Sequence, residues 1–150
     1  MKRTITAVSV VFLGLSSAYA DITAPNDVSF EDGAVELSVT GAGGNAETGR
    51  AVFLNRKQGN CLACHVNSDA ADAPFHGDVG PSLDGAGDRW SEAELRGIVT
   101  NSKMTFEDTI MPAFYIEAGY NRPLEKFAGK SILSAGQVED VVAYLLTLKE

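Results

Sequence analysis

Cys61-Leu62-Ala63-Cys64-His65 is the stretch from which the rest of the chain can be interpreted. Two thiols three positions apart, with a histidine directly after them, form the C-x-x-C-H pattern of covalent c-type haem attachment. Each sulfur joins one vinyl group of the haem, so both thiols must lie on the same side of one backbone turn. The imidazole of His65 then lies beneath the iron and becomes its proximal ligand. The sequence therefore predicts one haem c, bound covalently by Cys61 and Cys64.

The same cysteine pair has two other interpretations. A redox disulfide of the thioredoxin type would lie at the head of a strand–helix–strand unit, and no such pattern surrounds Cys61. A zinc site needs two further ligands, but the chain has no third cysteine and only one other histidine, His76. We interpret His76 as a solvated or turn-capping side chain in a loop over residues 66–79.

The first twenty residues are typical of a secretory signal peptide. Lys2 and Arg3 precede an apolar stretch too short to span a membrane, and a small-x-small cleavage site ends at Ala20. We expect the remainder to be one domain in a bacterial periplasm, where haem is attached to cytochromes c. Without Lys2 and Arg3 the formal net charge changes from −8 to about −10, which disfavours nucleic acid and anionic membranes as partners.

Residues 21–44 form an N-terminal extension ahead of the predicted cytochrome c domain. Within the extension, the residues from Ala34 to Thr40 alternate between apolar and polar, and glycines follow at 41–44. This alternation indicates a short strand or an extended arm that lies across the domain. A partly disordered N-terminus is an equally good interpretation of the same residues.

A helix is predicted to begin after the N-cap residue Asn45 and to end near Arg56. Gly49 and Phe53 share one face of this helix because they are four positions apart. A glycine inside a helix is unfavourable by up to about 1 kcal/mol relative to alanine. Its presence at position 49 therefore indicates that another helix crosses closely there.

Two further helices are expected to begin with capping boxes. Ser91 pairs with Glu94 in the first box, and Ser134 pairs with Gln137 in the second. The last helix carries an apolar stripe with helical spacing, formed by Val138, Val141, Val142, Leu145 and Leu146. This stripe is expected to pack on the helix that contains Gly49.

The stretch 109–115 is predicted to supply the second axial ligand of the iron. Its residue Met111 precedes Pro112, which favours an extended backbone at the residue before it and suits a ligand presented from a loop. A thioether is a suitable iron ligand, and a histidine–methionine pair raises the haem reduction potential. We predict Met111 as this ligand rather than Met104, which lies close to the end of the preceding helix.

A proline is expected to support the proximal ligand. Pro81 lacks an N–H, but its carbonyl can accept a hydrogen bond from the outer ring nitrogen of His65. Such a bond fixes the tautomer and the orientation of a ligating imidazole. With the iron closed by His65 and Met111, and with no general base evident beside the haem, we predict an electron carrier without catalytic residues.

The order of these parts resembles the class I cytochrome c fold over residues 45–150. That resemblance implies an all-α domain in which short helices surround a covalently bound haem, preceded by an extended N-terminal arm. A closer resemblance is to the SoxX family, the monohaem subunits of the SoxAX cytochromes of sulfur-oxidising bacteria. Four stretches together carry it, at residues 59–65, 80–85, 109–115 and 139–145.

The SoxX resemblance implies a heterodimer with a SoxA-type cytochrome. Such complexes act as L-cysteine S-thiosulfotransferases, which join thiosulfate oxidatively to a cysteine of the SoxYZ carrier protein. The joining chemistry belongs to the SoxA haem, and the SoxX haem passes the electrons to a soluble cytochrome c. Two alternatives remain open, a free-standing periplasmic electron shuttle and a haem sensor in which Met111 leaves the iron and a gas binds.

Overall fold

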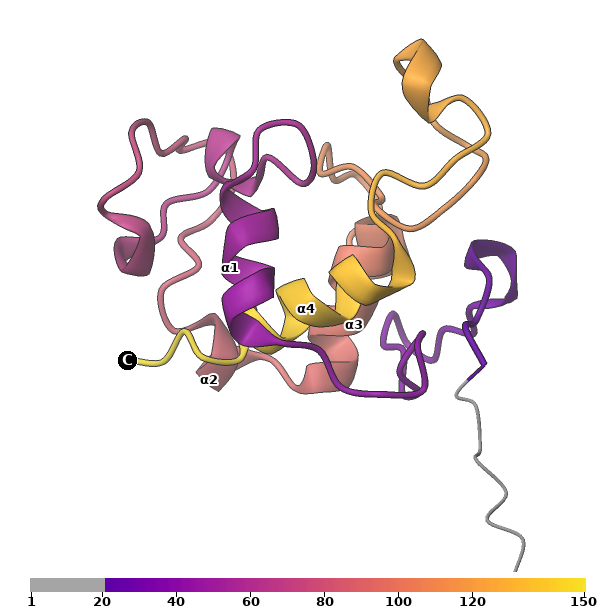
Figure 1. The fold of residues 1–150 in the computed structure, drawn as a ribbon, viewed down its shortest axis with the longest axis horizontal. Helices are drawn as coiled ribbons and strands as arrows, with labels where there is room; N and C mark the ends of the chain where they lie inside the picture. Colours follow the sequence, from indigo (N-terminus) through magenta and orange to yellow (C-terminus); the bar gives the residue numbers. More distant parts are fainter. Residues whose placement is uncertain (1–20) are drawn as a thin grey trace, which may run out of the picture.

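The computed structural model describes residues 21–150, and the predicted signal peptide at 1–20 lies outside the described residues. Within 21–150 the chain forms short helices and no β-strand, apart from an isolated bridge between Glu31 and Ala34 (Figure 1). No helix in this range is long and apolar enough to cross a membrane. The α-helices are α1 (Ala46–Leu54), α2 (Ala86–Arg89), α3 (Glu92–Asn101) and α4 (Ala135–Leu145), and the 3-10 turns are η1 (Pro25–Asp27), η2 (Cys61–Ala63), η3 (Ser68–Ala70), η4 (Ser102–Met104) and η5 (Glu125–Phe127).

Helices α1 and α4 cross closely, and α3 also packs on α4 (Figure 1). A Cβ at Gly49 of α1 would overlap the backbone carbonyl of Asp140 in α4, so only glycine permits this approach. Beside it, the rings of Phe53 and Tyr144 meet edge to face with their centroids 5.3 Å apart. The prediction that a helix crosses at Gly49 is therefore confirmed, and the crossing helix is the C-terminal one.

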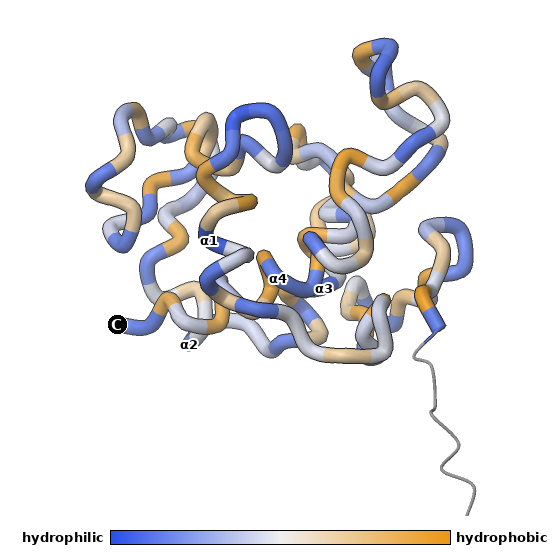
Figure 2. Tube along the Cα trace, in the orientation of Figure 1, coloured by the Kyte–Doolittle hydropathy of each residue, from blue (hydrophilic) through white to orange (hydrophobic). Residues whose placement is uncertain are grey.

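Helices α1, α3 and α4 begin where the sequence predicts, whereas α2 was not predicted. Asn45 caps α1, and both capping boxes form, at Ser91 and at Ser134. Helix α1 ends at Leu54 rather than near Arg56, because the backbone becomes extended at the next residue. The polar turn that follows, residues 55–60, appears as a hydrophilic arc between α1 and the haem motif in Figure 2.

The apolar stripe of α4 forms the middle of the hydrophobic core. Val138 and Val142 of α4 are almost completely buried, together with Phe53 of α1 and with Leu133, which lies just ahead of α4. Burying such side chains fully stabilises the fold by about 1.5–3 kcal/mol each. The core thus connects α1 and α4, as the sequence pattern predicts.

The N-terminal extension is an extended arm that lies against α3 and α4. Its residues Val35 and Val39 are buried. The backbone N–H of Val35 donates to the carbonyl of Ala93 in α3 at 3.0 Å, and that of Val39 donates to the Glu139 carboxylate in α4 at 2.8 Å. Because these partners replace a neighbouring strand, the strand interpretation is wrong and the arm interpretation is correct.

A buried ion pair fixes the arm to the helices. Arg96 of α3 and Glu139 of α4 are 3% and 2% exposed, and Arg96 Nε lies 2.9 Å from Glu139 Oε1. Arg96 Nη1 also donates to the Val35 carbonyl of the arm at 2.9 Å. At Gly97, a Cβ would overlap the backbone carbonyl of Gly33, so the arm crosses α3 at contact distance.

Residues 116–132 form a loop that projects from the body of the domain (Figure 1, orange). Most of its residues are exposed, including Leu124 at the start of η5. The hydroxyl of Tyr120 donates to the carbonyl of Ile116, which belongs to the same loop. The loop contains one short 3-10 turn, η5.

Candidate haem site

The two cysteines of the motif lie on the 3-10 turn η2. The N–H of Cys64 donates to the carbonyl of Cys61 at 3.1 Å, and both residues are free thiols. A Cβ at Gly59 would lie 3.0 Å from the Cys61 sulfur, which is closer than an ordinary contact. Burial raises the pKa of the Cys61 thiol to about 12. This thiol is therefore protonated at neutral pH, unlike the reactive thiolate of a thioredoxin-type site.

The imidazole of His65 is held in one orientation by the loop that follows it. Its Nδ1 donates to the carbonyl of Pro81 at 2.7 Å, so the hydrogen bond that the sequence predicts is present. A carbonyl can only accept, so Nδ1 carries the proton and Nε2 keeps a free lone pair. Gly80 passes directly over the ring, where a Cβ would overlap the imidazole.

Met111 is half-buried against the hydrophobic core, whereas Met104 is 51% exposed. The carbonyl of Met111 accepts hydrogen bonds from Ser102 Oγ and from Lys103 Nζ, each at 2.9 Å. Its N–H donates to Thr109 Oγ1 at 3.2 Å. Ser102 and Lys103 were not predicted from the sequence, because a backbone acceptor leaves no signal in the residue types around it.

His76 has both ring nitrogens engaged within its own loop. Nδ1 accepts from the N–H of Asn67 at 3.3 Å, and Nε2 donates to the carbonyl of Ala70 at 3.0 Å. The side chain is half-buried. It therefore connects two parts of the loop after the motif and is not simply solvated.

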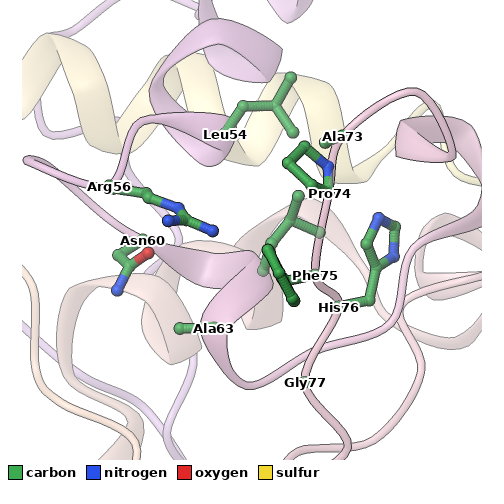
Figure 3. Close-up of a pocket in the computed structure, with 10 residues that line it drawn as sticks. Leu54, Arg56, Asn60, Ala63, Ala73, Pro74, Phe75, His76 and Gly77 are labelled. Atoms are coloured by element: carbon green, nitrogen blue, oxygen red, sulfur yellow. The ribbon is translucent and has the colours of Figure 1, made fainter.

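A cavity of about 400 Å³ lies beside the motif, between the end of α1, the turn η2 and residues 73–77 (Figure 3). Neither cysteine, nor His65, nor Met111 lines it, so this cavity is separate from the expected axial ligands. At its rim the Arg56 guanidinium lies over the exposed ring of Phe75, 5.8 Å from the ring centroid.

The residues at the motif fit a covalently bound haem. Two unlinked thiols share one turn, an imidazole presents a free Nε2, and the thioether of Met111 belongs to an apolar environment. The two thiols suit addition to the haem vinyl groups, and an imidazole and a thioether are donors of the kind that haem iron takes. Half-buried apolar side chains of the same region, including Leu83 and Trp90, pack against the core and can cover the faces of a macrocycle.

Comparisons with known proteins agree with this fit. The family model for cytochrome c matches residues 46–149. A chain in a crystal structure of SoxXA from P. pantotrophus is 54% identical, with a TM-score of 0.80, and the alignment covers 85% of this chain and 98% of that chain. A comparison with curated proteins found no match. The chain therefore belongs to the cytochrome c family, as a SoxX-type electron-transfer cytochrome with one covalently bound haem c.

Proposed function

We propose that this SoxX-type cytochrome is the electron-transfer subunit of a periplasmic complex with a SoxA-type cytochrome. The observation that carries the proposal is the 54% identity to a chain of SoxXA, over 98% of that chain. Cys61 and Cys64 would hold the haem, and His65 and Met111 would be the axial ligands of its iron. The haem, when bound, supplies reversible one-electron oxidation and reduction.

The residues of this chain prepare an iron site for electron transfer rather than for substrate binding. Pro81 keeps the proton on Nδ1 of His65 and so leaves Nε2 as the ligand atom. The anchored backbone of Met111 presents a thioether from a loop and would close the opposite side. With His65 and Met111 as its ligands, the iron would have no free position for thiosulfate or for a gas, and this chain would act in catalysis only through its partner.

The proposed reaction of the complex is the oxidative joining of thiosulfate to a cysteine of a SoxYZ-type carrier. A bond forms between the terminal sulfur of thiosulfate and the cysteine sulfur, and the cysteine S–H bond breaks. This step releases one proton and two electrons. A bound haem c would supply one-electron chemistry, so this chain would pass the two electrons on one after the other, and the acceptor that we propose is a soluble cytochrome c.

The first experiment is co-expression of the tagged chain with its SoxA-type partner in a bacterial periplasm. We expect the two proteins to co-purify in equal amounts, and we expect only the complex to turn over thiosulfate with a carrier protein. Recovery of the chain as a stable monomer under these conditions would support a free-standing electron shuttle instead. Thiosulfate turnover by the isolated chain would contradict the proposal directly.

The axial ligands are tested with a matched pair of methionine variants. Ferric haem with a methionine ligand has a weak far-red charge-transfer band, which we expect in the wild type and in Met104→Ala. Met111→Ala should lose the band and should bind carbon monoxide when reduced. Carbon monoxide binding by the reduced wild type at neutral pH would instead favour the haem-sensor alternative.

A further inference from the structure

Two side chains from the turn η4 converge on the backbone carbonyl of Met111. Ser102 Oγ and Lys103 Nζ both donate to this oxygen at 2.9 Å, and Lys103 Nζ also donates to the carbonyl of Thr109 at 3.0 Å. Ser102 is 0% exposed, and its hydroxyl has no second hydrogen-bond partner among residues 21–150. Leaving such a buried hydroxyl unpaired is unfavourable, so this hydrogen bond stabilises the folded position of the Met111 carbonyl.

The segment around Met111 has few other restraints. Ile110 is 80% exposed, and Pro112 has no backbone N–H to donate. Among the described residues, the backbone hydrogen bonds on either side are those of Thr109 N–H to the Phe106 carbonyl and of Phe114 N–H to the end of α3. Between these two points, the backbone is held by the groups that bond to Met111 and by the burial of Ala113, which is 1% exposed.

We propose that Ser102 and Lys103 are positioning residues that hold Met111 in place as an iron ligand, and we call them the carbonyl clamp. The inference rests on the proposed ligation by Met111. Turn η4 follows α3 directly in the sequence, across an extended backbone at Asn101 whose side chain caps the turn, and α3 is fixed by its packing on α4 and by the ion pair of Arg96. The clamp therefore connects the methionine loop to the turn that follows this packed helix.

The hydrogen bonds of Ser102 and of Lys103 differ in charge and in exposure to solvent. Ser102 makes a neutral hydrogen bond in a buried position, so salt should not weaken its effect. Lys103 is exposed and makes charge-assisted hydrogen bonds to two carbonyls, which are partly screened by water and salt. Removal of Ser102 Oγ should consequently have the larger effect on Met111, and removal of Lys103 Nζ the smaller.

The test is competition between Met111 and added imidazole for the ferric iron, measured on the holoprotein by loss of the far-red band. Imidazole binds only when Met111 has left, so its apparent affinity reports how firmly the methionine is held. We expect Ser102→Ala to bind imidazole about tenfold more tightly, equivalent to about 1.4 kcal/mol. Lys103→Gln should bind it about threefold more tightly, and Lys103→Arg should resemble the wild type.

Two matched variants separate the clamp from a general loss of stability. Ser134→Ala removes the cap of α4 and should lower the unfolding midpoint while leaving the imidazole affinity unchanged. Lys126→Gln removes a lysine from the projecting loop and should change neither quantity. Imidazole affinities of Ser102→Ala and Lys103→Gln equal to those of these controls would overturn the proposal.

The outcome for Met111→Ala distinguishes a failed clamp from a failed ligand assignment. If Met111→Ala keeps the far-red band, Met111 is not the ligand, and the proposal falls together with its premise. If that variant loses the band while both clamp variants bind imidazole as the wild type does, the ligand is correct and only the clamp is wrong. Lys103 is exposed, so Lys103→Gln folds and gives an answer even where Ser102→Ala does not.

Discussion

The arm over residues 21–44 and the loop over residues 116–132 contain little regular helix, yet the fold holds them very differently. The arm buries two valines and bonds to side chains and backbone of α3 and α4. The loop projects from the body, and the hydroxyl of Tyr120 bonds only within it (Figure 1). The difference lies in long-range polar anchors at buried positions. Irregular backbone is thus no measure of how firmly a segment is held.

The largest expected effect comes from breaking the anchor of the arm at Glu139. Glu139→Ala removes the buried carboxylate of the Arg96 guanidinium and leaves it with the exposed carboxylate of Glu92, and it also removes the acceptor for the N–H of Val39. We expect the free energy of unfolding to fall by about 3–5 kcal/mol, measured by denaturant unfolding of the holoprotein.

The double variant Arg96→Met/Glu139→Leu is the control for this effect. It removes both charges and keeps a similar volume, so it should recover much of the loss. Amide exchange should show that the arm is released in Glu139→Ala before the helices open. An unfolding free energy within about 1 kcal/mol of the wild type for Glu139→Ala would contradict the anchoring role.

The second effect tests the close passage of the arm over α3. Gly97→Ala places a methyl group on the carbonyl of Gly33, which should destabilise the domain by about 1–3 kcal/mol despite the better helix propensity of alanine. The measurement is the change in unfolding midpoint. Gly136→Ala in α4 is the matched variant, because nothing lies within 4 Å of its added Cβ. It should stabilise the domain slightly, and a similar result at Gly97 would show that the arm yields easily.

A pair of tyrosines compares the arm and the loop directly. The hydroxyl of Tyr115 donates to the carbonyl of Thr23 in the arm at 2.8 Å, and that of Tyr120 donates inside the loop. Tyr115→Phe should lower the unfolding free energy by about 1 kcal/mol. Tyr120→Phe should change it by less than about 0.5 kcal/mol. Equal losses in the two variants would remove the distinction between the segments.

Alkaline pH should loosen the arm through the same hydroxyl. Burial, and secondarily the charge of Glu117, raises the pKa of Tyr115 above its ordinary value. The protonated hydroxyl of Tyr115 therefore contributes fully to stability below about pH 10. This contribution is lost as the pH rises through the pKa of Tyr115 in the folded protein. Amide exchange in residues 21–44, corrected for its intrinsic pH dependence, should accelerate above about pH 10. Tyr115→Phe should lack that acceleration, and its persistence there would assign it to another group.

The smallest effect is expected at the tip of the loop. Leu124 is exposed beside η5, so Leu124→Ser should leave the unfolding free energy within about 0.5 kcal/mol of the wild type. The holoprotein variant is measured by thermal unfolding. A larger loss of stability would mean that the loop is packed against the body and that its contrast with the arm is overstated.

The sequence predicts those features of the fold that depend on local chemistry. The two capping boxes and the crossing at Gly49 follow from residue types at short spacing, and all three are present. The anchor of the arm does not follow in that way, because Arg96 and Glu139 are 43 positions apart. Each is a charged residue beside apolar helix positions, which is a signal of a buried partner but does not identify that partner.

The haem site likewise contains one hydrogen bond that the sequence predicts and others that it does not. The bond from His65 to Pro81 was predictable because a proximal imidazole needs an acceptor and a proline carbonyl follows nearby. The carbonyl clamp was not predictable, because serine and lysine at a helix end are common and their acceptor is a backbone atom. These contacts depend on the three-dimensional path of the loop around Met111, which brings its carbonyl to η4.

The position of the arm also has a consequence for the order in which the domain assembles. Val39 bonds to Glu139, 100 positions later, and α1 packs on α4 at the opposite end of the chain. Contacts of such separation form late and slowly, so neither N-terminal element can dock before the last helix is available. Until then, Cys61 and Cys64 belong to an open chain. We therefore expect the thiols to be accessible for haem attachment first, and the arm and α1 to dock on α4 afterwards.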